Sequence, residues 1–191
     1  MVSVSRFMSR VIIEFKDVHK SFNGLPVHKG INLSIREGEI MSLLGGSGSG
    51  KSVLLKELIG LMRPDKGDIV VFGNNVTRMR EDELIQLREH VGLLFQGAAL
   101  FDSLTVSENI AYPLREHLRL TEQEIQKRVE EKLQLVGLRG IEAKMPAELS
   151  GGMKKRVGLA RAIATEPDII LYDEPTTGLD PMTAQRINEL I

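Results

Sequence analysis

The stretch that decides the fold is IMSLLGGSGSGKS, residues 40–52. Residues 40–44 form a short apolar run that ends in glycines, which predicts a buried parallel strand entering a loop. The next eight residues match the phosphate-loop pattern of Gly, any four residues and Gly-Lys-Ser. Residues 52–61 carry apolar side chains all round, which predicts a buried helix. This order of strand, glycine-rich loop and helix indicates an α/β fold with a phosphate-binding loop.

The residues of this loop suit nucleotide phosphates. Glycines let the backbone wrap tightly, so that successive N–H groups can point at phosphate oxygens, and the following helix adds the positive end of its dipole. Lys51 would place a full charge at the β- and γ-phosphates, and the Ser52 hydroxyl would ligate Mg²⁺. A glycine-rich turn that only caps a helix is the alternative. The candidate phosphate-binding residues are Gly45, Gly46, Ser47, Gly48, Ser49, Gly50, Lys51 and Ser52.

Strand and helix patterns alternate along the rest of the chain. β-rich or apolar runs predict strands at residues 11–15, 31–35, 69–72, 91–95 and 168–173. Between residues 97 and 165 the pattern is helical, and Thr121 and Glu124 have capping-box spacing in front of an apolar face that ends at Gly137. We therefore expect one α/β domain with a mostly parallel sheet, an antiparallel β portion near the N-terminus and an inserted helical part.

The composition excludes several classes of function. The 191 residues carry a formal net charge of −1, which argues against a nucleic-acid partner. There is no cysteine, so disulfides and thiolate chemistry are excluded, and the four histidines lack metal-ligand spacing. We find no signal peptide and no run of the ~18 apolar residues that a membrane helix needs, so any membrane role is peripheral. We interpret the basic cluster Lys154, Lys155, Arg156 and Arg161 as solvated surface or a partner contact.

A second acidic motif follows the predicted strand at residues 168–173. The sequence Ile-Ile-Leu-Tyr-Asp-Glu ends in Asp173 and Glu174. At the carboxyl end of a parallel strand, Asp173 would lie beside the phosphate loop and hold Mg²⁺ through water. Glu174 would reach the attacking water as a general base. The alternative is a strand end that simply becomes polar at the surface.

A third motif, Leu-Ser-Gly-Gly-Met, occupies residues 149–153. Ser150 can cap the helix that follows, and Gly151 and Gly152 leave the N–H groups of its first turn open to an anion. A well-capped surface helix is the alternative. A second anion-binding helix start just before the Asp-Glu strand favours the functional interpretation.

With these motifs in this order, the sequence resembles the ATP-binding cassette (ABC) transporter family over nearly its whole length. Phe95-Gln96 corresponds to the family's Q-loop, residues 149–153 to its signature, and Gly178-Leu179-Asp180 to its D-loop. Phe22 is where members place an aromatic residue that stacks on adenine, unless it is a core phenylalanine. The resemblance implies a P-loop NTPase fold, with a RecA-like core at about 1–96 and 166–191 and a helical subdomain at about 97–165.

The resemblance also implies how such a subunit works. Two copies would dimerise head to tail and sandwich ATP, with Ser150, Gly151 and Gly152 of one copy against the γ-phosphate held by the other. Gln96 would join Ser52 and Asp173 at Mg²⁺. Residues after Gln96, including Phe101 and Asp102, would face integral membrane permease subunits, and Asp180 would cross the dimer interface. The subunit would lie on the cytoplasmic face of the inner membrane and hydrolyse ATP to power transport.

Two departures from the family pattern refine these expectations. Met153 stands where most members have glutamine, which is similar to the ATPases of phospholipid and Mce-type transport systems, so we expect a phospholipid or other hydrophobic cargo. Members also continue to a switch histidine, a position that none of His19, His28, His90 and His117 occupies. We therefore expect a partial chain that binds ATP and hydrolyses it poorly. A nucleotide-binding module without catalysis and a non-transport ABC ATPase stay open as alternatives.

Overall fold

The computed structural model describes residues 10–177 and 181–190. Their contacts divide the chain into two compact units, Met1–Ile85 and Gln86–Ile191, and the boundary falls inside helix α2 (Glu81–Glu89). The N-terminal stretch in which we expected no signal peptide and the expected D-loop residues Gly178, Leu179 and Asp180 lie outside the described residues. No helix of the described ranges is long and apolar enough to cross a membrane.

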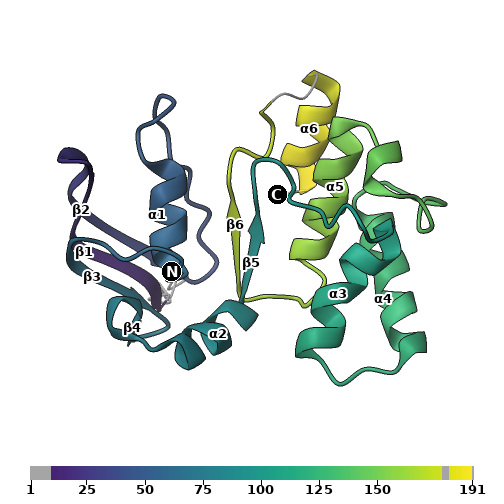
Figure 1. Cartoon of the computed structure of the whole chain (residues 1–191), viewed down its shortest axis with the longest axis horizontal. Coiled ribbons are helices and arrows are strands. Elements are labelled where there is room, and N and C mark those ends of the chain that lie inside the picture. The colour runs from purple at the N-terminus through teal and green to yellow at the C-terminus, as the bar shows by residue number, and fades with distance from the viewer. Residues whose placement is uncertain (1–9, 178–180, 191) are drawn as a thin grey trace, which may run out of the picture. The chain divides into compact units, whose positions relative to one another are not determined.

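The first unit is built on an antiparallel sheet (Figure 1). Its four strands lie in the order β2-β1-β3-β4, with bounds β1 Val11–Phe22, β2 Leu25–Arg36, β3 Lys66–Val71 and β4 Asn74–Asn75. β1 and β2 form a hairpin across Asn23 and Gly24, whose φ angles of 50° and 78° suit the Asn-Gly turns that match strand twist. The antiparallel β portion expected near the N-terminus is confirmed.

Helix α1 (Lys51–Leu58) lies beside this sheet (Figure 1). It buries Leu54 and Leu58, and the sheet buries Ile13, Phe15 and Ile69. The apolar pattern thus accounts for most of the core of this unit. Glu57, on the buried face of α1, is 1% exposed and is an exception to that pattern.

Residues 40–44 are not a strand, contrary to the prediction from their apolar run. Ile40 is 78% exposed and Leu44 is 96% exposed. A parallel strand needs a neighbour that runs in the same direction, whereas the β1–β2, β1–β3 and β3–β4 pairs of this unit are all antiparallel. The segment therefore has no ladder within its own unit, and apolarity alone did not make it a strand.

The second unit contains a parallel pair of strands, β5 (Val91–Leu94) and β6 (Ile169–Tyr172). Their register aligns Val91 with Ile169 and Leu94 with Tyr172, so both strands end at the same edge. Among the described residues, β5 and β6 form the parallel pair, and the other paired strands are antiparallel. The structure is thus of the expected α/β class.

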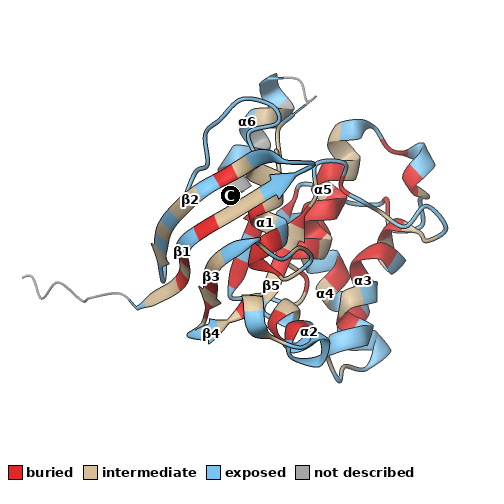
Figure 2. Ribbon diagram, turned by 60° about the vertical axis from the view of Figure 1, so that its left-hand side comes forward, coloured by how far each residue is buried: buried red, intermediate tan, exposed pale blue. Residues whose placement is uncertain are grey.

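Helices make up most of the second unit (Figure 1). They are α3 (Val106–His117), α4 (Glu122–Leu135), α5 (Gly151–Ala162) and α6 (Pro181–Leu190). Buried residues concentrate on the facing sides of α3, α4 and α5 (Figure 2). On α4 these are Ile125, Val129 and Leu133, spaced four apart as one helical face requires. The expected helical character of residues 97–165 is confirmed, while the proposed subdomain limits stay a prediction.

The capping box expected at Thr121 is present. The Thr121 hydroxyl accepts a hydrogen bond from the Glu124 N–H at 3.4 Å, and the Glu124 carboxylate accepts one from the Thr121 N–H at 2.7 Å. The hydrogen bonds that the Thr121 N–H and hydroxyl donate to the Glu124 carboxylate hold the pKa of Glu124 below its usual value. A second box of the same kind, between Thr105 and Glu108, starts α3. Two helices of the second unit therefore begin at positions that their own sequence specifies.

We expect Thr121→Ala to lower the free energy of unfolding by about 1 kcal/mol, because it leaves N-terminal N–H groups of α4 without an acceptor. Thr121→Ser keeps the hydroxyl and should stay close to the parent chain. Urea unfolding followed by circular dichroism measures both. Equal stability of the alanine and serine variants would contradict the assigned role of the cap.

Candidate nucleotide-binding site

The phosphate loop, residues 45–50, curls back on itself in front of α1. The Lys51 ammonium donates hydrogen bonds to the Gly45 carbonyl at 2.9 Å and to the Gly46 carbonyl at 3.1 Å. A turn between Gly46 and Ser49 is closed by a backbone hydrogen bond of 3.2 Å. The loop is exposed to solvent and the first turn of α1 carries no acidic side chain. The positive end of the helix and the Lys51 charge therefore lie on one short segment.

Gly50 is the point at which the loop becomes a helix. Its φ angle is 94°, in the left-handed region that glycine adopts without a Cβ penalty. A Cβ at this position would come within 2.5 Å of Val27 Cγ1 and 2.7 Å of His28 Nε2. The Gly50 carbonyl accepts the first helical hydrogen bond, from Leu54. Both the backbone angle and the close approach of β2 thus demand the last glycine of the motif.

Phe22 lies at the end of β1, next to the hairpin turn. It is 40% exposed, so the alternative that it is a core phenylalanine is wrong. The Lys20 ammonium lies 5.6 Å from the centroid of its ring. An exposed ring with a cation on it is a surface on which a planar base can stack, and stacking on adenine stays a prediction.

The carboxyl ends of β5 and β6 bring two of the predicted residues together. The Gln96 amide donates a hydrogen bond of 3.1 Å to the Glu174 carboxylate. The N–H of Asp173 continues the ladder by bonding the Leu94 carbonyl at 2.9 Å. Because parallel strands end at one edge, side chains 78 positions apart meet there. A carboxylate oriented by an amide in this way is suited to accept a proton from a water molecule that approaches it.

Glu174 is also fixed through its backbone. Its φ angle of 48° is unusual for a residue other than glycine. The Thr177 hydroxyl donates a hydrogen bond of 3.1 Å to the same carboxylate oxygen that Gln96 contacts. Such geometry persists only where neighbouring contacts determine it. The carboxylate of Glu174 is therefore held in one orientation from two sides.

The predicted signature forms the start of α5. Ser150 is the N-cap, and its hydroxyl accepts a hydrogen bond of 3.3 Å from the Met153 N–H. No acidic residue lies in the first turn. A Cβ on Gly151 would meet no atom within 4 Å, so the space in front of this helix start is open. The predicted helix start and its serine cap are confirmed, and anion binding there stays a prediction.

Lys155, Arg156 and Arg161 of the basic cluster are not simply solvated surface, contrary to one of our two interpretations, and a partner contact of the cluster stays a prediction. Lys155 is 8% exposed, and its ammonium donates hydrogen bonds to the carbonyls of Glu174, at 3.3 Å, and Thr177. Burial lowers the pKa of Lys155, while the charge of Glu174 acts to raise it. The Arg161 guanidinium donates to the carbonyls of Ala98 at 2.8 Å and Ala99 at 2.9 Å.

Cations of helix α5 therefore hold two loops by hydrogen bonds. Arg161 holds the loop after β5, which follows Gln96, and Lys155 holds the loop after β6, which contains Glu174. Arg156 likewise donates to the Val136 and Gly137 carbonyls at the end of α4. Net charge and residue type did not reveal these roles. The signal in the sequence was helical spacing. Positions 155 and 161 lie on the side of α5 that also carries the buried Gly158.

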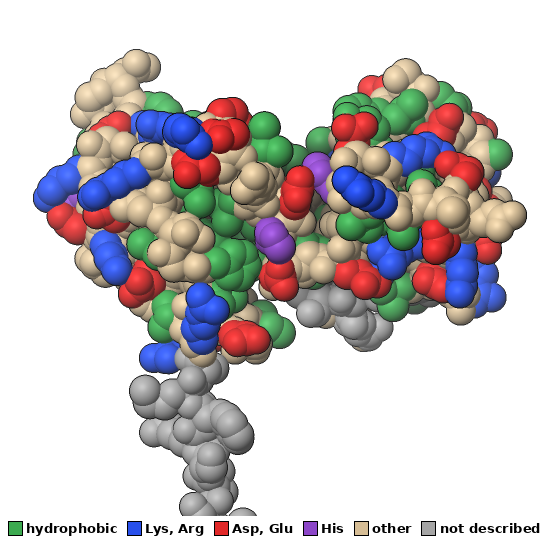
Figure 3. Space-filling model, turned by 90° about the horizontal axis from the view of Figure 1, so that it is seen from below, with side chains coloured by type: hydrophobic (Ala, Val, Ile, Leu, Met, Phe, Trp, Pro, Cys, Tyr) green, Lys and Arg blue, Asp and Glu red, His purple; other side chains and the backbone are tan. Residues whose placement is uncertain are grey.

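Surface charge follows the composition. Basic and acidic side chains are interspersed on the face that Figure 3 shows, without a single-sign patch of the kind that nucleic acids require. Within residues 10–177 and 181–190, no three His, Cys, Asp or Glu side chains gather as a protein-only metal site. Ser52 in the first unit, and Gln96 and Asp173 in the second, carry side-chain oxygen atoms of the kind that Mg²⁺ binds, and their role as its ligands stays a prediction.

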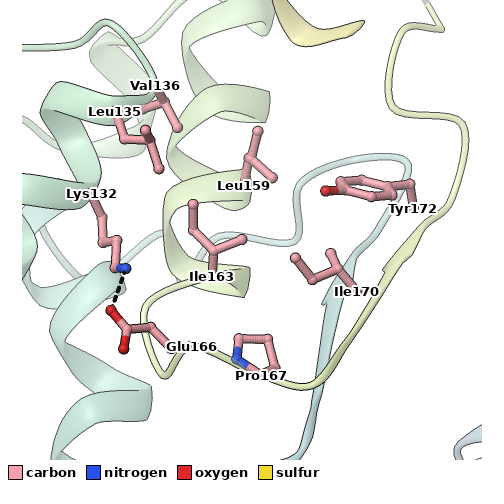
Figure 4. A pocket seen from close by; sticks show the side chains of 9 residues that line it. All are labelled: Lys132, Leu135, Val136, Leu159, Ile163, Glu166, Pro167, Ile170 and Tyr172. Carbon is pink, nitrogen blue, oxygen red and sulfur yellow. Dashed lines mark hydrogen bonds and ion pairs between the residues drawn. The ribbon is translucent and has the colours of Figure 1, made fainter. Parts of the chain in front are cut away.

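A cavity of about 350 Å³ in the second unit is separate from the predicted residues. It lies between α4, α5 and β6, and Figure 4 shows Ile163, Ile170 and Tyr172 on its walls beside the Lys132–Glu166 ion pair. None of the predicted site residues lines it. The predicted nucleotide-binding residues lie on loops, helix starts and one strand end. Phe22 and residues 45–52 lie in the first unit, and Gln96, Ser150, Gly151, Gly152, Asp173 and Glu174 lie in the second.

Comparison with known proteins connects these features to one family. The family model described as "ABC transporter" matches residues 28–177. The chain is 50% identical over 181 residues to the probable ribonucleotide transport ATP-binding protein mkl of Mycobacterium leprae, covering 95% of this chain and 52% of that protein. It is 42% identical over 184 residues to the intermembrane phospholipid transport system ATP-binding protein MlaF of Haemophilus influenzae, covering 96% and 70%.

A solved structure agrees with these sequence matches. The dimeric post-hydrolysis state of an ATP-binding cassette bound to ADP and Pi superposes with a TM-score of 0.88 at 35% identity, covering 94% of this chain and 81% of that chain. This chain spans about half the length of the mycobacterial relative. The family model covers the phosphate loop, the Gln96 loop, the Ser150 helix start and the Asp173-Glu174 pair in one continuous match. The chain belongs to the ABC transporter family, as an ATP-binding domain.

Proposed function

We propose that this chain binds Mg·ATP and hydrolyses it as the energy-supplying subunit of an ABC transporter. The observation that carries the proposal is the curled glycine loop in front of α1, with Lys51 folded over it and no acidic side chain in the first helical turn. That segment has the charge and the exposed N–H groups that triphosphates require. Phosphate release from Mg·ATP, measured as a function of protein concentration, tests the proposal directly.

In this proposal each residue has a defined task. The N–H groups of residues 45–52 bind the phosphates, Lys51 neutralises the β- and γ-phosphate charge, and Phe22 stacks on adenine. Ser52, Asp173 and Gln96 hold Mg²⁺, which supplies charge neutralisation at the phosphates. Glu174 takes the proton of the attacking water, and its bond to Gln96 orients it for this task.

A second copy of the chain completes the proposed site. The open N-terminus of α5, with Ser150, Gly151 and Gly152, would contact the γ-phosphate held by the partner. ATP would then join two copies, and hydrolysis would release them, which gives a two-state switch. Support comes from the solved cassette to which this chain is similar, which is described as dimeric and bound to ADP and Pi. Specific activity that rises with protein concentration is the expected sign.

Integral membrane permease subunits are the proposed mechanical partners. Phe101 and Tyr112 are 43% and 44% exposed, and their rings lie 5.0 Å apart between centroids. The Arg161 guanidinium lies 5.6 Å from the Phe101 ring and also holds the Ala98 and Ala99 carbonyls. A partner that binds this aromatic pair would therefore be connected, through Arg161, to the loop that follows Gln96. We place the subunit on the cytoplasmic face of the inner membrane.

For the cargo we propose a phospholipid or another hydrophobic molecule. Met153 in the signature motivates this choice, and a relative described as an intermembrane phospholipid transport protein supports it. The name of the mycobacterial relative points instead to ribonucleotides. Stimulation of ATP hydrolysis by phospholipid in the assembled transporter, with no response to ribonucleotide cargo, separates the two.

A nucleotide-binding module without catalysis is the competing class. It would dimerise with ATP and release no phosphate, whereas a non-transport ABC ATPase would hydrolyse ATP without a permease. The hydrogen-bonded Gln96–Glu174 pair favours catalysis, because a module that only binds needs no oriented base.

We expect Lys51→Ala to weaken ATP binding by about tenfold or more, because a charge-assisted hydrogen bond to phosphate is lost. Lys56→Ala removes the same charge from an exposed position on the same helix and should leave affinity unchanged. Titration with a fluorescent ATP analogue measures both variants. Unchanged affinity of Lys51→Ala would refute the role of Lys51.

We expect Glu174→Gln to retain ATP binding and to reduce phosphate release by about a hundredfold or more, because general bases contribute on this scale. The variant should also accumulate as an ATP-bound dimer in size-exclusion chromatography with light scattering. Glu130→Gln changes an exposed carboxylate on α4 and serves as the control. Normal turnover of the Glu174 variant would rule out its assignment as the base.

A further inference from the structure

A buried acid–base pair lies directly behind the phosphate loop. His28 on β2 and Glu57 on α1 have side chains only 2% and 0% exposed, and His28 Nδ1 lies 2.9 Å from Glu57 Oε2. His28 Nδ1 and both carboxyl oxygens of Glu57 are buried without a hydrogen bond of good geometry, so the contact between the two side chains is a close ionic one. Burying two ionisable groups among apolar side chains costs free energy unless they are paired and hydrogen-bonded. The family motifs assign no task to either residue.

The second ring nitrogen of His28 points at the loop. His28 Nε2 lies 3.1 Å from the Gly50 carbonyl oxygen. A carbonyl can only accept a hydrogen bond, so Nε2 carries a hydrogen. Burial raises the pKa of Glu57, and the nearby His28 acts in the opposite direction.

This contact reaches the most constrained residue of the loop. Gly50 has its left-handed backbone angle, and its carbonyl also accepts the first hydrogen bond of α1. Lys51, whose ammonium closes the loop, is the next residue. A donor on the Gly50 carbonyl therefore fixes the orientation of the peptide group from which both the loop and the helix begin.

We propose that His28 and Glu57 are positioning residues for nucleotide binding, with Glu57 holding the His28 ring so that Nε2–H anchors the Gly50 carbonyl. The proposal rests on the function proposed above and assigns it two further residues. Neither side chain touches the nucleotide. They act by keeping residues 45–50 in the phosphate-binding shape before ATP arrives, which lowers the cost of ordering the loop on binding.

Other charges near the pair are already engaged. Lys20 and Asp65 are the further charged groups that act on Glu57, and they bond each other at 2.9 Å. Lys20 also donates to the Arg63 carbonyl at 2.8 Å. The carboxyl group of Glu57 therefore has His28 as its one close ionic partner within the described residues.

The test uses two double variants of the full chain that differ only in which ring nitrogen they imitate. E57L removes the buried carboxylate in both, so that neither leaves an unpaired acid. In H28Q/E57L the amide nitrogen takes the position of Nε2 and can still donate to Gly50. In H28N/E57L the amide nitrogen takes the position of Nδ1 and cannot reach Gly50. H19L, which breaks the exposed His19–Asp17 pair of the same sheet, is the control.

We expect H28N/E57L to bind ATP about three- to tenfold more weakly than H28Q/E57L, the range of one hydrogen bond, with H19L unchanged. Hydrogen exchange without nucleotide should also quicken in residues 45–54 of H28N/E57L alone. Equal affinity and equal exchange in the two double variants would overturn the proposal. If the parent chain bound no ATP, the proposed function would fail, while the exchange measurement would still decide whether this pair anchors the loop.

Discussion

The parallel pairing of β5 with β6 is the constraint on which the second unit depends. The pairing aligns the ends of the two strands, and only then can an amide and a carboxylate 78 positions apart share a hydrogen bond. The backbone ladder extends one residue further, through Asp173. Helix α5 secures both outgoing loops from one side. Its close contact with β5 requires Gly92, where a Cβ would lie 2.3 Å from the Ala162 carbonyl oxygen.

The two units present helix starts of the same physical kind. α1 begins after Gly50 and α5 begins after Ser150, and neither has an acid in its first turn. Each start leaves N–H groups and a positive dipole end available to an anion. They differ in support, because the α1 start is held by Lys51 and His28, whereas the α5 start is held by its own serine cap. The α1 start contacts the neighbouring strand β2, whereas a Cβ on Gly151 at the α5 start would meet no atom within 4 Å.

The sequence predicted those features that depend on local rules. The phosphate loop, the Thr121 capping box and the Ser150 cap follow from residue types at fixed spacing, and the structure has all three. The burial of Lys155 could not be predicted from the sequence. A lysine is buried only where the fold supplies acceptors, and here they are carbonyls distant in sequence. The strand predicted at residues 40–44 was wrong because a strand needs a neighbouring strand to pair with, and apolar side chains alone do not supply one. His28 and Glu57 looked ordinary in sequence because their partnership is purely spatial.

The turn after Gln96 has a mechanical consequence. Ala98 and Ala99 have φ angles of 62° and 47°, which cost alanine on the order of 1 kcal/mol each. Their conformation is held by the Arg161 guanidinium and by contact with the bare Gly158 face of α5. The turn therefore keeps an unfavourable backbone conformation that contacts from helix α5 hold in place. Loss of the Arg161 hydrogen bonds would remove contacts that offset this cost, and the segment beside Gln96 would then relax to a more favourable backbone conformation.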